Sequence, residues 1–328
     1  MENMSYLEAG RAALIEEMRA DPDVWALGED LGRGGVFGQY KGLAEEFGPR
    51  RIMDTPISEA CIMGAAVGAA MTGTRPVVEM RFSDFALCAI DELVNQAAKA
   101  RYMFGGQTRV PLVVREPMGM WRSSAAQHSQ SLEAWYAHIP GLVVTAPATP
   151  QDNYSLLRAA IRADDPVVHL EHKNLWHDEG LVERTAPAPG PDEFGRARLT
   201  RRGDDLTVIT WSAMLYPCLE AAEKLFREGI GAEVIDLRTL WPWDKETVLQ
   251  SVRKTGRCLV VHEAVAVGGF GGEIAATVQE KAFSSLKGPV RRLGAPRVPI
   301  SYAPPLEDMV RVSTEQIITL AREMMRAG

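Results

Sequence analysis

The stretch of sequence that decides the fold is Asp54-Thr55-Pro56-Ile57-Ser58-Glu59-Ala60-Cys61-Ile62-Met63-Gly64. It places a single acid, Glu59, at the start of a segment of small and apolar residues that runs to about Gly73. Thr55 and Pro56 predict a helix start, because a hydroxyl caps a first turn and proline fits inside it. Two interpretations of Glu59 stay open: a first-turn carboxylate that complements the helix dipole, or a catalytic carboxylate held in an apolar wall.

The bulk composition is that of an ordinary globular protein. The chain has 328 residues, of which 46% are hydrophobic and 24% charged, enough for two domains with cores of their own. Its net charge of −7 argues against a nucleic-acid partner. We expect neither a signal peptide nor a membrane segment, because the first residues lack a basic stretch and the apolar run 60–71 is too short. The four cysteines form no CxxC pair, which disfavours a zinc site and fits a reducing cytoplasm.

Apolar segments of strand length alternate with segments of helical periodicity. In the first half, the expected strands are 24–28, 51–54, 75–80, 110–115, 142–146 and 166–171. The expected helices between them are 41–47, 58–71, 85–104, 132–138 and 151–162. Strand–helix alternation of this kind predicts an α/β fold with a parallel sheet that is covered on both faces.

The segment 183–196 interrupts this pattern, because it is rich in proline and glycine and has no apolar period. Alternation then resumes, with strands expected at 205–211, 232–237 and 257–262 and helices at 214–228, 244–255, 272–283 and 314–326. We therefore predict two parallel-sheet domains, at 1–185 and 200–328, joined by a linker at 186–199.

Two places along the chain could carry chemistry. Ligands of open parallel sheets bind beyond the carboxyl ends of the strands, and Glu59 directly follows the strand expected at 51–54. The loop 116–130 is long for a compact domain, which is typical of functional loops, and His128 lies near its end between amide and hydroxyl side chains. The alternative is that His128 is structural or merely exposed.

Other motifs give weaker evidence for a function. The glycine-rich loops 32–38 and 268–273 do not have the spacing of a dinucleotide fingerprint, since the third glycine counted from Gly269 would fall on Ile274. The histidines show no HExxH or HxxxH spacing, so the sequence does not predict metal binding by histidine.

Several motifs occur together in one order: Gly28-Glu29-Asp30, Gly34-Gly35-Val36-Phe37, Lys41-Gly42-Leu43, Asp54-Thr55-Pro56-Ile57-Ser58-Glu59, His128-Ser129-Gln130-Ser131, Asp165-Pro166-Val167 and Trp241-Pro242-Trp243-Asp244. In this arrangement the chain resembles the β subunit of thiamine diphosphate-dependent 2-oxo acid dehydrogenases. Proteins of that family form the decarboxylating component of pyruvate, branched-chain and acetoin dehydrogenase complexes. The resemblance extends from Tyr6 to the last expected helix.

The resemblance implies a transketolase-like fold, with a pyrimidine-binding domain followed by a transketolase C-terminal-like domain. It also implies an α2β2 heterotetramer that delivers its product to a lipoyl acyltransferase core. The cofactor, thiamine diphosphate, would lie at the boundary with the α subunit, which holds the diphosphate and its Mg²⁺. The sequence agrees with this division, because it contains no Gly-Asp-Gly followed by the asparagine of a diphosphate anchor.

The resemblance also assigns roles to single residues. Glu59 matches the acid that hydrogen-bonds the pyrimidine ring nitrogen of the cofactor. Ile57 and Phe85 match residues that line the pyrimidine pocket, and His128 matches a histidine that faces the reacting carbon. A structural K⁺ would be held at Leu112, Ala160, Ile161, Ala163 and Asp165.

Arg81 stands where branched-chain relatives often have glutamine, so the resemblance favours pyruvate or acetoin as substrate and places Arg81 at the substrate pocket. Three alternatives remain: a branched-chain β subunit, a non-catalytic interaction subunit, and a self-sufficient transketolase-type enzyme. The small residues of the helix at 58–71, Gly64 and Gly68 among them, would let a helix of another subunit approach closely. Packing within the domain is the alternative explanation for these small residues.

Overall fold

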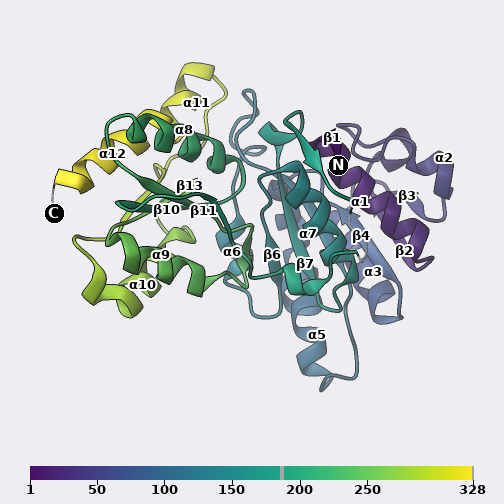
Figure 1. The fold of residues 1–328 in the computed structure, drawn as a ribbon. Helices are drawn as coiled ribbons and strands as arrows, with labels where there is room; N and C mark the ends of the chain where they lie inside the picture. Colours follow the sequence, from purple (N-terminus) through teal and green to yellow (C-terminus); the bar gives the residue numbers. More distant parts are fainter. Residues whose placement is uncertain (185–187, 327–328) are drawn as a thin grey trace. The chain divides into compact units, whose positions relative to one another are not determined.

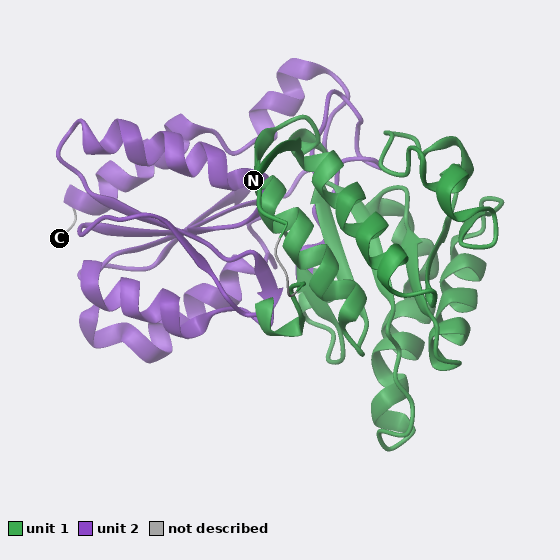
Figure 2. Cartoon of the chain, turned by 45° about the vertical axis from the view of Figure 1, so that its right-hand side comes forward, with its two compact units in different colours: residues 1–118, 135–194 green, residues 119–134, 195–328 purple. Residues whose placement is uncertain are grey.

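The structure is a computed structural model that describes residues 1–184 and 188–326. Its compact units are residues 1–118 with 135–194 (unit 1) and residues 119–134 with 195–328 (unit 2) (Figure 2). Residues 186 and 187 of the expected linker lie outside the described residues. Residues 119–134 group with unit 2, although the sequence predicts a first domain that runs without interruption over 1–185.

Unit 1 is built on a parallel sheet (Figure 1). Its strands are β2 (Val24–Gly28), β3 (Ile52–Asp54), β4 (Arg75–Glu79), β5 (Val113–Met118), β6 (Val143–Thr145) and β7 (Val167–His172). They follow one another in the order β6-β7-β5-β4-β2-β3, and each neighbouring pair is parallel. Most of their residues are buried, as expected for a parallel sheet covered on both faces. The carboxyl ends of these strands therefore meet at one edge of the sheet.

The helices of unit 1 are α1 (Tyr6–Ala20), α2 (Leu43–Phe47), α3 (Glu59–Met71), α4 (Ser83–Ala86), α5 (Ala98–Met103) and α7 (Pro150–Arg162), and α6 (Glu133–Ala137) begins in unit 2. A short antiparallel pair joins β1 (Glu2–Ser5) to β8 (Glu179–Val182). Helix α1 was not expected from the sequence, although Ser5 and Glu8 form a complete capping box at its start. It packs against α7 over a core that includes Leu14 and Leu157.

Two expected elements of unit 1 differ in the structure. The strand expected at 110–115 lies at Val113–Met118, because it pairs with all of Val167–His172. The single helix expected at 85–104 is divided into α4, a 3-10 turn, the π-helical turn Glu92–Ala97 and α5. π-Helical turns of this kind are frequent at functional sites.

Unit 2 contains a second, mostly parallel sheet, between α8 and α12 on one face and α9 and α10 on the other (Figure 1). Its strands follow the order β14-β13-β10-β11-β9, and only β9 is antiparallel. They are β9 (Arg198–Arg201), β10 (Leu206–Thr210), β11 (Ala232–Asp236), β13 (Cys258–Val265) and β14 (Arg291–Ala295). The other elements of this unit are β12 (Thr239–Trp241), α8 (Leu215–Phe226), α9 (Lys245–Thr255), α10 (Gly271–Ala282), α11 (Pro304–Val310) and α12 (Thr314–Arg326).

The two ends of α9 are set by local chemistry. Asp244 caps α9 by accepting the N–H of Thr247, and Gly256 ends that helix in the left-handed conformation at a φ of 75°.

Among residues 1–184 and 188–326, no helix is both long enough and apolar enough to cross a bilayer.

Candidate active site

The first part of the candidate site is the start of α3. The helix spans Glu59–Met71 with Ser58 as its N-cap residue, close to the expected 58–71, and Thr55 and Pro56 lie before its first turn. The backbone N–H of Thr55 instead donates to the carbonyl of Gly28, 3.0 Å away, which ties the end of β3 to the end of β2. Glu59 therefore occupies the first position of the helix, where the dipole favours a negative charge.

The side chain of Glu59 is half-buried. Within the described residues it makes no hydrogen bond and no ion pair, although most half-buried acids of this chain have partners. Ile62 and Met63 are buried behind it, whereas the side chain of Ile57 is 73% exposed. Of these three apolar neighbours of Glu59 in the sequence, two are thus buried and Ile57 is open to solvent.

Arg81 follows β4 at the same edge of the sheet. Its guanidinium forms ion pairs with Glu29, at 3.4 Å, and with Asp30, at 3.2 Å. Asp30 adopts a left-handed conformation with a φ of 61° in the loop after β2. Because Arg81 already has two carboxylate partners, its charge does not require a substrate carboxylate.

Phe85 lies on α4 and is half-buried. Its ring packs edge-on against Phe82, with 5.5 Å between the ring centroids, and the ammonium group of Lys173 lies 4.6 Å from the Phe82 ring centre. Helix α3 packs against β4 and against the turns that follow Phe85. Unit 1 therefore brings Ile57, Glu59, Arg81 and Phe85 to one edge of its sheet, whereas His128 belongs to unit 2.

Sequence reasoning missed a buried polar network behind this edge. Arg115 pairs with both oxygens of Glu171, with nitrogen–oxygen distances of 2.9 Å, and Asn153 donates to Glu171 as well. Burial raises the pKa of Glu79 to about 7, and its carboxyl oxygens accept from Gln39 and Tyr40. The sequence does carry a signal for this network, because each of three buried strands contains a charged residue. Glu79 on β4 pairs in register with Arg115 on β5.

The loop that carries His128 leaves β5 at Gly119. The N–H of Gly119 donates to the carbonyl of Gln130 at 3.1 Å, which closes the base of the loop. The N–H of His128 donates to the carbonyl of Ala125 at 3.4 Å, and the His128 side chain is half-buried. The loop is attached to unit 2, where Met120 packs with Ala295 and Val310.

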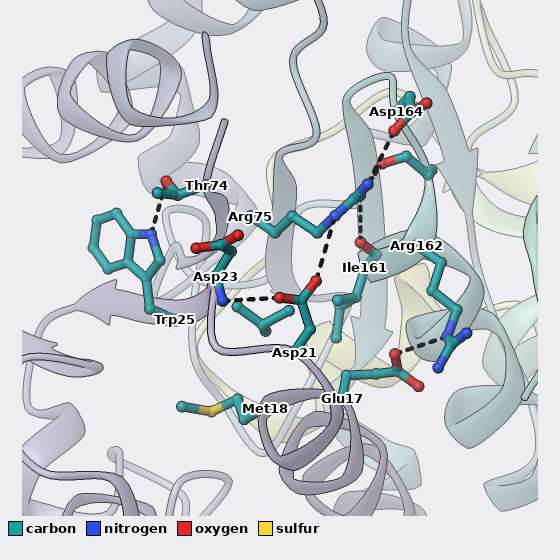
Figure 3. Close-up of polar contacts among 12 residues, drawn as sticks. Glu17, Met18, Asp21, Asp23, Trp25, Thr74, Arg75, Ile161, Arg162 and Asp164 are labelled. Carbon is teal, nitrogen blue, oxygen red and sulfur yellow. Dashed lines mark hydrogen bonds and ion pairs between the residues drawn. The ribbon is translucent and has the colours of Figure 1, made fainter. Parts of the chain in front are cut away.

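The donors expected to hold K⁺ are already engaged. One guanidinium nitrogen of Arg75 donates to the carbonyl of Ile161 at 3.1 Å (Figure 3) and to that of Ala163 at 2.9 Å. The same side chain forms ion pairs with Asp164 and Asp21. A fixed positive charge thus lies at two of the carbonyls that a potassium ion would use.

The other expected donors also have partners. The carbonyl of Leu112 accepts the N–H of Val167, the carbonyl of Ala160 closes the end of α7, and Asp165 pairs with Arg101 at 2.6 Å. The residues present do not fit a bound K⁺ well, and no step of the chemistry is assigned to that ion. Among the described residues, no group of three or more histidine, cysteine or acidic side chains could hold a metal.

Comparisons with known proteins agree with this architecture. The chain matches the family models "Transketolase, pyrimidine binding domain" over residues 2–177 and "Transketolase, C-terminal domain" over residues 195–317. A solved structure titled "Split gene transketolase, inactive beta4 tetramer" has the same fold, with a TM-score of 0.80, 22% identity and 99% of both chains covered. The two-domain, transketolase-like α/β fold predicted from the sequence is confirmed.

Curated relatives match over nearly the full length. The 2-oxoisovalerate dehydrogenase subunit beta of Bacillus subtilis is 42% identical over 99% of both chains. The acetoin:2,6-dichlorophenolindophenol oxidoreductase subunit beta of Cupriavidus necator is 44% identical over 96% of both. The mitochondrial pyruvate dehydrogenase E1 component subunit beta-1 of Arabidopsis thaliana is 44% identical over 99% of this chain and 89% of that protein.

Proposed function

The chain belongs to the transketolase-like family of thiamine diphosphate-dependent 2-oxo acid and acetoin dehydrogenase β subunits, and we propose that it is the catalytic β subunit of a pyruvate or acetoin dehydrogenase. The observation that carries this proposal is the carboxylate of Glu59. It lies at the carboxyl edge of a parallel sheet, half-buried and without a partner among the described residues.

The residues of unit 1 fit the pyrimidine end of the cofactor. Thiamine diphosphate, when bound, supplies a carbon nucleophile that adds to the carbonyl of the substrate. Glu59 would hold a proton at the pyrimidine ring nitrogen, a role that suits a carboxyl with no protein partner. The half-buried ring of Phe85 and the exposed side chain of Ile57 offer the apolar surface that an aromatic ring requires.

His128 would serve the substrate. Its imidazole is half-buried and carries two ring nitrogens, one of which can donate and the other accept a hydrogen bond at the reacting carbonyl. The same group could orient the lipoyl group that accepts the product. We assign His128 to proton transfer or acceptor orientation and Glu59 to the cofactor.

The remaining parts of the site would come from other chains. The β subunits among the curated relatives belong to multi-subunit enzymes, so an α subunit is the implied partner. We propose that the α subunit binds the diphosphate and its Mg²⁺ in an α2β2 assembly, since this sequence has no diphosphate anchor. The assembly would pass its product to a lipoyl acyltransferase, in the cytoplasm.

The proposed substrate is pyruvate or acetoin. Relatives named for 2-oxoisovalerate, acetoin and pyruvate have similar identities, between 42% and 44%. Arg81 keeps a charged, polar group at the carboxyl edge of the sheet, which disfavours a branched aliphatic substrate if that group faces the pocket. Because Arg81 is held by Glu29 and Asp30, it could also act only within the chain.

The test is turnover of the purified chain alone and of the complex with its α subunit, using an artificial electron acceptor. We expect no turnover by the chain alone and activity of the complex with pyruvate or acetoin. A clear preference for 2-oxoisovalerate in the specificity constants would overturn the small-substrate assignment and leave the thiamine chemistry intact. Turnover by the chain alone would contradict the dependence on an α subunit.

A further inference from the structure

The loop around His128 is strained. Three of its residues other than glycine adopt left-handed backbone conformations, with φ of 43° at Arg122, 58° at Ser123 and 60° at Ala125. Residues with a β-carbon rarely adopt this conformation unless the surrounding structure holds them there. Ala125 is directly linked to His128, because its carbonyl accepts the His128 N–H. What holds the strained segment also sets the position of the histidine.

Glu307 holds the strained segment. Its carboxylate is 2% exposed and accepts the backbone N–H of Ser123, with 2.7 Å between oxygen and nitrogen. Arg311, one helical turn further on, forms an ion pair with the other oxygen of Glu307. The guanidinium of Arg311 also donates to the carbonyl of Met120 at 3.4 Å. One buried carboxylate and one guanidinium thus bind residues 120–123.

Glu263 holds the two ends of the loop together. It lies on β13, and one of its oxygens accepts both the N–H of Met120, at 2.8 Å, and the hydroxyl of Ser131, at 3.1 Å. Met120 precedes His128 and Ser131 follows it. One carboxylate oxygen therefore joins the residue at the start of the loop to a residue at its end.

We propose that Glu307 and Glu263 are positioning residues for His128, with Glu307 holding the strained turn and Glu263 the two ends of the loop. In this proposal neither carboxylate contacts substrate or cofactor. Each acts on His128 through the loop that carries it. The inference rests on the proposed function, because it gives His128 a part in turnover. Both carboxylates come from the transketolase C-terminal domain, so this domain would contribute to catalysis.

The test is a double-mutant cycle in the complex with the α subunit. Glu307→Gln should lower kcat by about ten-fold or more, because a small misplacement of a catalytic group is costly. His128→Ala should lower kcat at least as much, and the double variant should be no slower than His128→Ala alone. The affinity for thiamine diphosphate should stay within about two-fold in all three, because Glu59 and the α subunit are unchanged.

Glu228→Gln is the matched control. Glu228 forms an exposed, two-bonded ion pair with Arg322 in the same unit and does not contact the loop. It should leave kcat unchanged. Ser131→Ala serves as a milder variant if Glu307→Gln fails to fold, since it removes one bond to Glu263 and leaves no buried charge. We expect Ser131→Ala to lower kcat less than Glu307→Gln does. Added to His128→Ala, it should cause no further loss of kcat.

The variants distinguish failure of the positioning role of Glu307 from failure of the proposed role of His128 in turnover. If His128→Ala keeps normal turnover, the role of His128 and this inference both fail. If His128→Ala is impaired while Glu307→Gln and Ser131→Ala resemble Glu228→Gln, the role of His128 stands and the positioning role is wrong. Losses in kcat that multiply in the double variant would show that Glu307 acts independently of His128, and the positioning role would be wrong.

Discussion

At the scale of the residue, Glu59 has two possible roles that the structure makes separable. A first-turn carboxylate that only complements a helix dipole contributes about 0.3–1 kcal/mol of stability. A carboxyl that shares a proton with the cofactor affects turnover instead. The lack of any partner for Glu59 among the described residues favours the second role.

We predict that Glu59→Gln keeps the fold and lowers turnover of the complex by about 10²-fold or more, because the amide cannot hold the proton. The measurement is kcat with an artificial electron acceptor at saturating cofactor. Glu273→Gln is the control, since Glu273 is also a first-turn acid, on the exposed face of α10. Turnover within a few-fold of wild type for Glu59→Gln would leave only the dipole role.

At the scale of the element, α3 presents two different surfaces. A β-carbon at Gly64 would lie 3.6 Å from the side chain of Glu92, so this position packs within unit 1. A β-carbon at Gly68 would meet no atom within 4 Å. Packing within the unit therefore accounts for Gly64, and at Gly68 the contact with another subunit stays a prediction.

We predict that Gly68→Leu blocks assembly with the α subunit without weakening the fold of the chain. Leucine favours a helix over glycine, and the position has room within this chain. The measurement is sedimentation of the mixed subunits, with Gly68→Ala as the small-residue control. An intact assembly with Gly68→Leu would show that this face of α3 does not take part in the subunit interface.

At the scale of the whole molecule, the buried network should set the response of stability to pH. Burial raises the pKa of Glu79 from 4.5 to about 7. Tyr40, Arg115 and Glu171 lie around it, and Glu116 is a further buried acid nearby. A raised pKa in the folded state means that the folded chain holds this proton more tightly than the unfolded chain. Its stabilising contribution is therefore complete below pH 4.5 and is lost as the pH rises to about 7.

We predict that the wild-type chain loses stability relative to Glu79→Gln between pH 4.5 and pH 8, by up to about 3 kcal/mol. Glutamine copies the neutral carboxyl and does not titrate. The measurement is the free energy of unfolding in urea at several pH values for both proteins. Parallel curves over this range would mean that Glu79 is ionised in the folded state.

The sequence by itself determined the fold class and the family, whereas the roles that the resemblance gives to Glu59, Phe85 and His128 stay predictions. The fold class and the family depend on alternation of strands and helices and on local motifs, which the linear chain records. The sequence reading missed α1, although Ser5 and Glu8 form a capping box at its start and its buried residues recur at helical spacing.

Only the tertiary structure decided which charges meet. Arg75 lies about 90 residues before the carbonyls that it binds, and Ser123 is separated from Glu307 by 184 residues. No periodicity links residues so far apart, since their contact depends on how strands and loops are ordered in space. The same reason explains why the loop of His128 belongs with unit 2, since its hydrogen bonds go to Glu263 and Glu307 far along the chain.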